Sequence, residues 1–285
     1  MTKECVTGRS APGKACARSA GRSAWLIASL AGAAAFAAEG VRAADLEFTG
    51  YARDLETRRL LYVESHHVRD AGQKGETRIV LYRCASGREP FARKELRYGE
   101  VREEPEFAFV DERSGYSEGL RRTAQGPRVF QRERRGAPER EAKVPGKVAI
   151  VSDAGFDEFV RKHWRELEAG ETVRFPFLIP SRLDFLTFKV RKQGEEPVEG
   201  ATSSVIRLNL SGVLGWFLPY IEVSYRKSDQ VLVRYKGLTN IRDAEGGNTV
   251  ALIEFPAKER RVLPAGGAAL DSKGSEPLVA RCADG

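Results

Sequence analysis

The sequence contains no apolar run long enough to cross a membrane as a helix. The stretch from Ala24 to Ala38 carries no charge, but its 15 residues fall short of the roughly 20 that a bilayer-spanning helix needs. No cysteine stands near the end of this stretch, where a lipid would be attached. We therefore expect neither a transmembrane segment in the mature chain nor a lipid anchor.

The chain also offers little material for a metal or catalytic site, since it has only 3 histidines. His66 and His67 are adjacent in a predicted strand and would point to opposite faces. Glu64 and His66 would share a face, but a third ligand would have to come from elsewhere. Polar residues at the exposed end of a strand are the favoured interpretation, so we expect no metal and no cofactor.

The predicted catalytic candidates have simpler explanations. Ser181 lies in Pro180-Ser181-Arg182, without the flanking glycines of a nucleophile elbow. The nearby carboxylates of Asp153 and Asp157 suit helix capping, and His163 suits the boundary between core and surface. We expect the protein not to be an enzyme.

The first 43 residues have the three parts of a secretory signal peptide. Basic residues precede the uncharged stretch, and Val41-Arg42-Ala43 places small residues at the positions that signal peptidase reads. The alternative is an uncleaved anchor. The arginine- and alanine-rich composition suggests a GC-rich bacterial genome, so we expect a protein exported to the periplasm.

Removing residues 1–43 takes away six basic and two acidic residues and lowers the formal net charge from +7 to +3. The remaining basic residues are interleaved with acids, which indicates a solvated surface rather than a track for phosphates. Nucleic-acid binding is therefore not expected.

Two of the four cysteines, Cys84 and Cys282, remain after cleavage. An exported protein is exposed to oxidising conditions, so we predict a disulfide between them, which would stabilise the fold by about 4 to 5 kcal/mol in the chain-entropy model. Two unpaired thiols are the alternative.

Alternation of apolar and polar residues predicts a mainly β (α+β) fold: a curved antiparallel sheet or half-barrel of about ten strands that wraps one amphipathic helix. We expect one domain over residues 44–255 and a poorly structured tail over 256–285. Pro176 predicts an edge or a bulge, and residues 132–146 are expected to form a long exposed loop. The predicted strands lie at 60–64, 79–84, 106–109, 129–131, 173–179, 186–191, 206–210, 221–225, 231–235 and 249–255.

One helix of about four turns is predicted from Phe156. Its apolar residues recur at helical spacing, Asp153 would cap its amino end, and Gly170 would end it. A helix of this length covers only part of a ten-stranded sheet, so the sheet must close on itself or leave a cavity.

This layout resembles a group of uncharacterised exported bacterial proteins whose fold is similar to that of periplasmic lipoprotein carriers. The resemblance covers most of residues 45–255. It is carried by four segments: Arg59-Leu60-Leu61-Tyr62, Asp153-Ala154-Gly155-Phe156-Asp157, Phe177-Leu178-Ile179-Pro180-Ser181-Arg182 and Tyr235-Lys236-Gly237. It implies a half-barrel with helices under its open side and an apolar pocket between.

The apolar segment 211–220 breaks the alternation and could either plug the barrel or border a pocket. The pocket interpretation predicts a site for a hydrophobic, lipid-like ligand, formed by Trp164, Phe185, Phe188, Trp216, Phe217 and Tyr220. The alternative function is an envelope structural or assembly factor that acts through a protein partner.

Overall fold

The computed structural model describes residues 44–145, 149–211 and 220–283. The predicted signal peptide, residues 1–43, lies outside the described part of the chain. Within that part, no helix is both long and apolar enough to cross a membrane.

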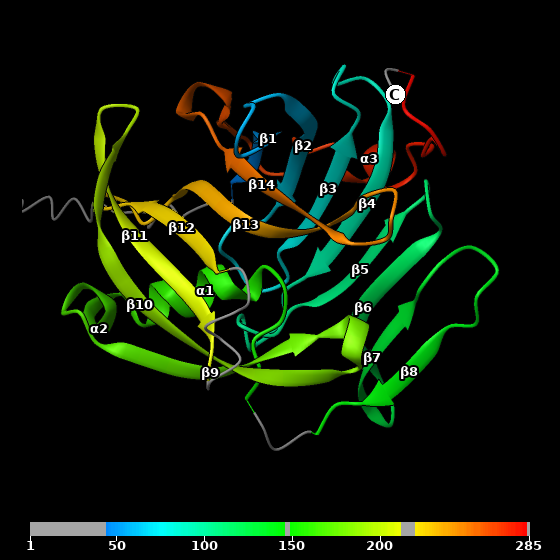
Figure 1. Ribbon diagram of the computed structural model, residues 1–285, viewed down its shortest axis with the longest axis horizontal. Helices are drawn as coiled ribbons and strands as arrows, with labels where there is room; N and C mark the ends of the chain where they lie inside the picture. Colours follow the sequence, from blue (N-terminus) through cyan, green and yellow to red (C-terminus); the bar gives the residue numbers. More distant parts are fainter. Residues whose placement is uncertain (1–43, 146–148, 212–219, 284–285) are drawn as a thin grey trace, which may run out of the picture. The chain divides into compact units, whose positions relative to one another are not determined.

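The fold is built on one antiparallel sheet that curves round two short helices (Figure 1). The strands of the described chain lie in the order β8-β7-β6-β5-β4-β3-β2-β1-β14-β13-β12-β11-β10-β9, and β15 also pairs with β1, giving a 15-stranded sheet. The mainly β class is confirmed, although the strands outnumber the ten that were predicted. Their bounds are β1 (Asp45–Arg53), β2 (Leu60–Arg69), β3 (Thr77–Arg83), β4 (Pro90–Arg97), β5 (Glu106–Asp111), β6 (Tyr116–Thr123), β7 (Gly126–Arg132), β8 (Arg140–Lys143), β9 (Thr172–Ile179), β10 (Asp184–Val198), β11 (Ala201–Leu210), β12 (Ile221–Arg226), β13 (Leu232–Arg242), β14 (Asn248–Glu254) and β15 (Arg261–Leu263).

Local sequence explains the hairpins. The turn between β2 and β3 contains Gly72 and Gly75 at φ values of 76° and 85°, which glycine adopts without steric cost. Pro176 lies in β9, the last strand of the sheet, where a missing N–H is tolerated. The predicted loop at 132–146 contains β8, a short strand with mostly exposed side chains.

The predicted single helix is two helices, α1 (Gly155–Lys162) and α2 (Trp164–Glu168). The break falls at His163, which has φ −101° and ψ 21°. Asp153 does not cap the helix by a side-chain hydrogen bond: the N-cap residue is Ala154. Gly170, at φ 81°, follows the end of α2 as predicted.

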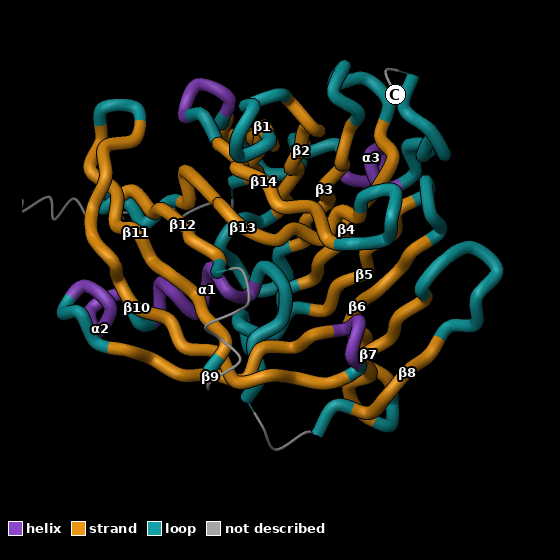
Figure 2. Tube along the Cα trace, in the orientation of Figure 1, coloured by secondary structure: helices purple, strands orange, loops and turns teal. Residues whose placement is uncertain are grey.

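The short helices α1 and α2 lie within the curve of the sheet (Figure 2). The inner face of the sheet carries two apolar clusters. The first joins β1–β7 to β13 and β14, and includes the fully buried Tyr62, Phe91 and Phe109. The second packs α1 and α2 against β9–β12, and Tyr235 touches both clusters. The two helices thus fill part of the concavity.

The segment after Pro256 is more ordered than predicted. It contains the 3-10 helix η3 (Ala257–Glu259), strand β15 and helix α3 (Leu270–Gly274). Leu270 and Ala268 are buried against Ile79 and Leu81 of β3. Ile79 and Leu81 alternate with inner-face residues of β3, so their side chains form an apolar area on the outer face of the sheet. Other residues must shield this area from water. The covering elements are too short to show a periodic pattern in the sequence.

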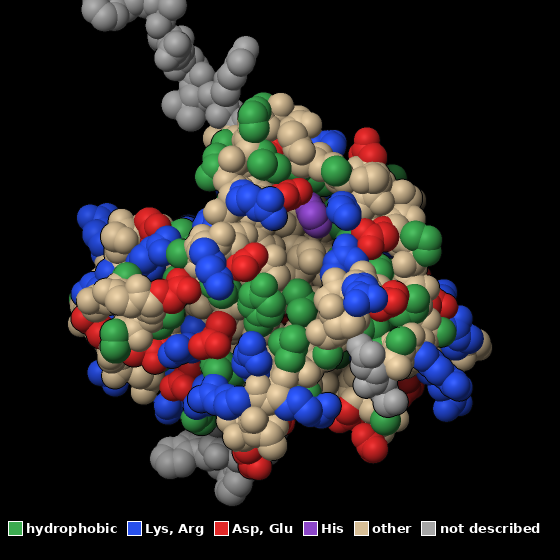
Figure 3. All heavy atoms as spheres, turned by 90° about the horizontal axis from the view of Figure 1, so that it is seen from above, with side chains coloured by type: hydrophobic (Ala, Val, Ile, Leu, Met, Phe, Trp, Pro, Cys, Tyr) green, Lys and Arg blue, Asp and Glu red, His purple; other side chains and the backbone are tan. Residues whose placement is uncertain are grey.

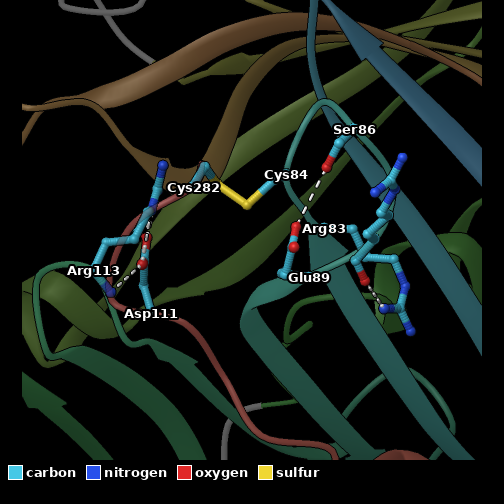
Figure 4. The surroundings of a disulfide bond; sticks show 8 residues. Arg83, Cys84, Ser86, Glu89, Asp111, Arg113 and Cys282 are labelled. Atoms are coloured by element: carbon cyan, nitrogen blue, oxygen red, sulfur yellow. Dashed lines mark hydrogen bonds and ion pairs between the residues drawn. A yellow bond between two sulfur atoms is a disulfide. The ribbon is translucent and has the colours of Figure 1, made fainter. Parts of the chain in front are cut away.

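The predicted disulfide between Cys84 and Cys282 is present (Figure 4). It attaches the end of the chain to the residue that follows β3. An ion pair strengthens the attachment, because Arg83 donates to both carboxylate oxygens of Glu276 at 2.7 and 3.0 Å.

Candidate functional site

The second apolar cluster is only partly closed on the inner face. Phe156 and Phe159 of α1 pack on Phe175 of β9, with ring centroids 5.8 and 4.2 Å apart. Around this buried centre, several large apolar side chains remain partly exposed. We call four of them the concave apolar patch: Trp164, Phe177, Phe188 and Ile221.

The structure brings together some of the predicted ligand-binding residues. Trp164 and Phe188 contact the same cluster. Phe185 packs against the first cluster instead, together with Leu178, its partner on β9. Tyr220 is 38% exposed and lies under the guanidinium of Arg207, 4.1 Å from the ring centroid.

Trp216 and Phe217, the remaining predicted ligand-binding residues, lie outside the described residues. Ser181, in turn, lies in the 3-10 helix η1 (Pro180–Arg182) between β9 and β10. This position agrees with the turn role predicted for it.

A polar network crosses the interior beside the first cluster. Lys94 of β4 donates to Asp153 at 2.7 Å and to Asn240 of β13 at 3.2 Å. Asn240 in turn donates to Glu118 of β6 at 2.6 Å, and the Tyr116 hydroxyl donates to the other oxygen of Glu118, also at 2.6 Å. Lys94 and Glu118 are both buried, so each charge depends on these partners for its solvation.

Burial raises the pKa of Glu118, although the hydrogen bonds from Tyr116 and Asn240 and the charge of Lys94 oppose the shift. Hydrogen bonds thus engage the charged groups of this network and connect β4, β6 and β13 to Asp153, two residues before α1. The network is difficult to predict from the amino-acid sequence, because Lys94 and Glu118 occupy positions where a strand's inner face is usually apolar.

A second set of polar contacts holds α1 inside the concavity. The guanidinium of Arg102 bridges Glu76, at 2.7 Å, and Glu158 of α1, at 3.1 Å. On the other side of the helix, the hydroxyl of Tyr225 donates to Asp157 at 2.6 Å. Packing and these bonds together fix the helix relative to the sheet.

We expected the paired histidines to be exposed at the end of a strand. They lie instead in the middle of β2. His66 contacts Glu64 at 3.0 Å and stacks on Phe48 with ring centroids 4.2 Å apart. Burial lowers the pKa of His66 despite the contact with Glu64. No group of three or more His, Cys, Asp or Glu side chains suited to a metal occurs among residues 44–145, 149–211 and 220–283.

Residues 115–119, Gly-Tyr-Ser-Glu-Gly, have the glycine-serine spacing of a nucleophile elbow, a motif that was not among the predicted catalytic candidates. The structure does not support that role. Ser117 lies in β6 and pairs with Val110 of β5 in an antiparallel hairpin, whereas an elbow requires a sharp turn from a strand into a helix.

Figure 3 shows the face of the molecule seen from above. Basic and acidic side chains and a histidine gather on this face, and hydrophobic side chains are exposed beside them. This face is therefore amphipathic.

Two clefts lie on the outer face. The larger, of about 650 Å³, has basic residues balanced by Glu196, Glu222 and Glu254. The smaller, of about 250 Å³, has no acidic residue in its lining. It is formed by Thr172, Lys189, Arg191, Gln193, Arg207 and Asn209.

No protein-family model matches the chain, and no curated protein matches it. Among solved structures, it is similar to a beta-barrel-like protein of the domain of unknown function DUF1849 from Brucella abortus, with a TM-score of 0.47 and 7% identity over 78% of this chain and 99% of that one.

Two further structures show weaker similarity. A DUF1329 family protein from Desulfovibrio piger has a TM-score of 0.31 and 10% identity over 84% of this chain and 92% of that one. A putative outer membrane lipoprotein-sorting protein domain from Vibrio parahaemolyticus has a TM-score of 0.29 and 6% identity over 82% and 90% of the respective chains. Similarity at this level assigns neither a family nor an activity to this chain.

Proposed function

We propose that this chain is an exported binding protein that holds a hydrophobic, lipid-like ligand against the concave apolar patch. The observation that carries this proposal is the partial exposure of Trp164, Phe177, Phe188 and Ile221 beside a buried apolar cluster. Large apolar groups left open on a concave surface are typical of sites for hydrophobic ligands. Covering them would remove apolar area from water and so favour binding.

Export is part of the proposal. The three-part segment at residues 1–43 supports it, and so does the Cys84–Cys282 disulfide, since such bonds persist in oxidising compartments. The amino-terminal residue of the protein recovered from cells tests this point. We expect the chain to start at Ala44, and the presence of residues 1–43 would contradict export with cleavage.

We propose binding rather than catalysis. The buried acid and base groups, Lys94 and Glu118, are engaged in hydrogen bonds within the interior network. The alternative role, assembly through a protein partner added to the sheet edge, has less support. The edge strand β9 contains Pro176, and β8 is largely charged and exposed, features that discourage strand addition.

The test is ligand uptake by the purified protein. We expect native mass spectrometry to detect bound lipid, or uptake of added palmitic acid. Replacing one patch phenylalanine, as in Phe188→Ser or Phe177→Ser, should weaken binding by about tenfold or more, since a buried aromatic side chain contributes about 1.5–3 kcal/mol.

Val262→Ser is the matched control. Val262 is 73% exposed on β15, away from the patch, and its replacement should leave uptake unchanged. Circular dichroism would verify that each variant is folded. A protein that is free of lipid when purified and takes up no palmitic acid would overturn the proposal.

A further inference from the structure

The smaller cleft lies on the face of the sheet that the proposed ligand site does not use. Lys189 and Arg191 of β10 alternate with Phe188 and Val190, which face the second apolar cluster. Because successive strand residues point to opposite faces, the two basic side chains project from the outer face of the sheet. This site is therefore independent of the proposed function.

The strand register places like charges directly opposite one another here. Arg191 of β10 pairs with Arg207 of β11, and Lys189 of β10 pairs with Arg174 of β9. Directly opposed like charges destabilise a sheet. Two such pairs in adjacent positions on one face require an opposite charge to offset them.

The described residues supply only part of that charge. Arg207 donates to Glu222 at 2.7 and 3.0 Å. Arg191 donates to the backbone carbonyl of Gly170 at 3.0 Å, which fixes its side chain without neutralising it. Lys189 has neither an ion pair nor a side-chain hydrogen bond with another residue of the described chain. Among the described residues, Glu222 is thus the one acidic partner of these four cations, which are Arg174, Lys189, Arg191 and Arg207.

The lining of the cleft suits an oxyanion. Besides its three cations it offers neutral polar groups on Thr172, Gln193 and Asn209. Guanidinium groups match phosphate geometry by paired hydrogen bonds, and rigid strands hold them in place. The larger cleft, in contrast, has three glutamates in its lining.

We infer that the cleft formed by Thr172, Lys189, Arg191, Gln193, Arg207 and Asn209 binds a phosphate group. Either a soluble phosphate compound or the headgroup of an anionic lipid could present it. An oxyanion between Arg191 and Arg207 would relieve the repulsion between them.

The two sources are distinguished with two probes. One is sodium pyrophosphate, titrated calorimetrically at low ionic strength. The other is flotation with vesicles of phosphatidylglycerol, compared with vesicles of phosphatidylcholine. Pyrophosphate binding without flotation identifies a soluble ligand, and flotation with phosphatidylglycerol alone identifies a headgroup. Absence of both overturns the inference.

The variant Arg191→Gln provides the sharper test, with Lys258→Gln as its control. Lys258 is an exposed residue of η3, so the control removes the same charge outside the cleft. Arg191→Gln should weaken binding by about tenfold, while Lys258→Gln leaves it nearly unchanged. An equal loss in both variants would show unspecific attraction to the net charge and overturn the site.

Thermal unfolding provides a further test, because Arg191→Gln is expected to weaken binding but to raise the unfolding temperature of the free protein. In buffer without phosphate, Arg191→Gln should unfold at a higher temperature than the wild type, because it removes one of two opposed cations. Adding pyrophosphate should raise the unfolding temperature of the wild type more than that of the variant. A lower unfolding temperature of the variant in both buffers would contradict the repulsion on which the inference depends.

Discussion

Lys94 and Asp153 form an ion pair in the interior of the sheet, with 2.7 Å between Nζ and Oδ2 and side chains only 7% and 8% exposed. Asp153 lies two residues before the first residue of α1, so this contact joins the sheet to the start of the helix. The pair therefore helps to place α1 in the concavity.

Replacing Lys94 by methionine should be strongly destabilising. The change leaves the buried carboxylate of Asp153 without its cation, and breaking a buried pair in this way costs about 3–5 kcal/mol. Urea unfolding measures the loss. Lys74→Met is the control, because Lys74 and Glu100 form an exposed pair whose removal should leave the unfolding free energy nearly unchanged. Equal losses in the two variants would contradict a structural role for the buried pair.

Glu118 should make the fold less stable as the pH rises. Its pKa is raised in the folded protein, chiefly by burial, so the folded state holds this proton more tightly than the unfolded state. The contribution is present below the ordinary carboxyl pKa of 4.5 and is lost as the pH passes through the raised value. Relative to Glu118→Gln, the wild type should therefore lose unfolding free energy as the pH rises above 4.5.

Glu76 provides the opposite case. Burial alone would raise its pKa, but the charge of Arg78 and hydrogen bonds from Gly72, Arg102 and Arg78 outweigh burial and lower it. Relative to Glu76→Gln, the wild type should gain unfolding free energy as the pH rises towards 4.5. Urea titrations across this range test both signs, and pH-independent differences would contradict both assignments.

Gly119→Ala should disrupt the hairpin of β5 and β6. A Cβ atom at this position would lie 2.1 Å from the carbonyl oxygen of Phe107 and 2.6 Å from the Phe130 ring. Overpacking of this kind costs about 1–3 kcal/mol or more. At Gly99 nothing lies within 4 Å of the added atom, so Gly99→Ala should change the unfolding free energy by about 0.5 kcal/mol at most. Similar thermal unfolding of both variants would count against the close packing at Gly119.

Removing the disulfide should lower stability by about 4 to 5 kcal/mol in the chain-entropy model. The double change Cys84→Ala with Cys282→Ala tests this by urea unfolding. The wild type in reducing buffer should behave like the double variant. If reduction leaves the unfolding midpoint unchanged, the cross-link contributes nothing to stability.

The elements that the sequence predicted well are those with apolar inner-face residues. In β5, Phe107 and Phe109 are buried on either side of the exposed Ala108, so alternation revealed the strand. The strands β4 and β6 went unpredicted because Lys94 and Glu118 occupy inner-face positions. A buried network depends on partners distant in sequence, and alternation within one strand does not reveal them.

The candidate sites were predictable to different degrees. Trp164 and Phe188 both pack against the second cluster, because an amphipathic helix packs on the apolar face of a sheet. Phe185 was assigned to the same group, but it packs against the first cluster near the start of β10. The outer-face cleft was not predicted, since it depends on the register that brings Arg191 opposite Arg207.

The bond between Cys84 and Cys282 has a consequence for the connectivity of the molecule. With a sequence separation of 198, it closes most of the folded chain into a covalent ring. A protease that cuts once at an exposed hairpin, such as the one at Gly200 between β10 and β11, opens the ring without releasing either piece. The nicked protein would therefore migrate as a single species until a reducing agent separates its fragments, so one cleavage within the ring is insufficient to shed any part of the sheet.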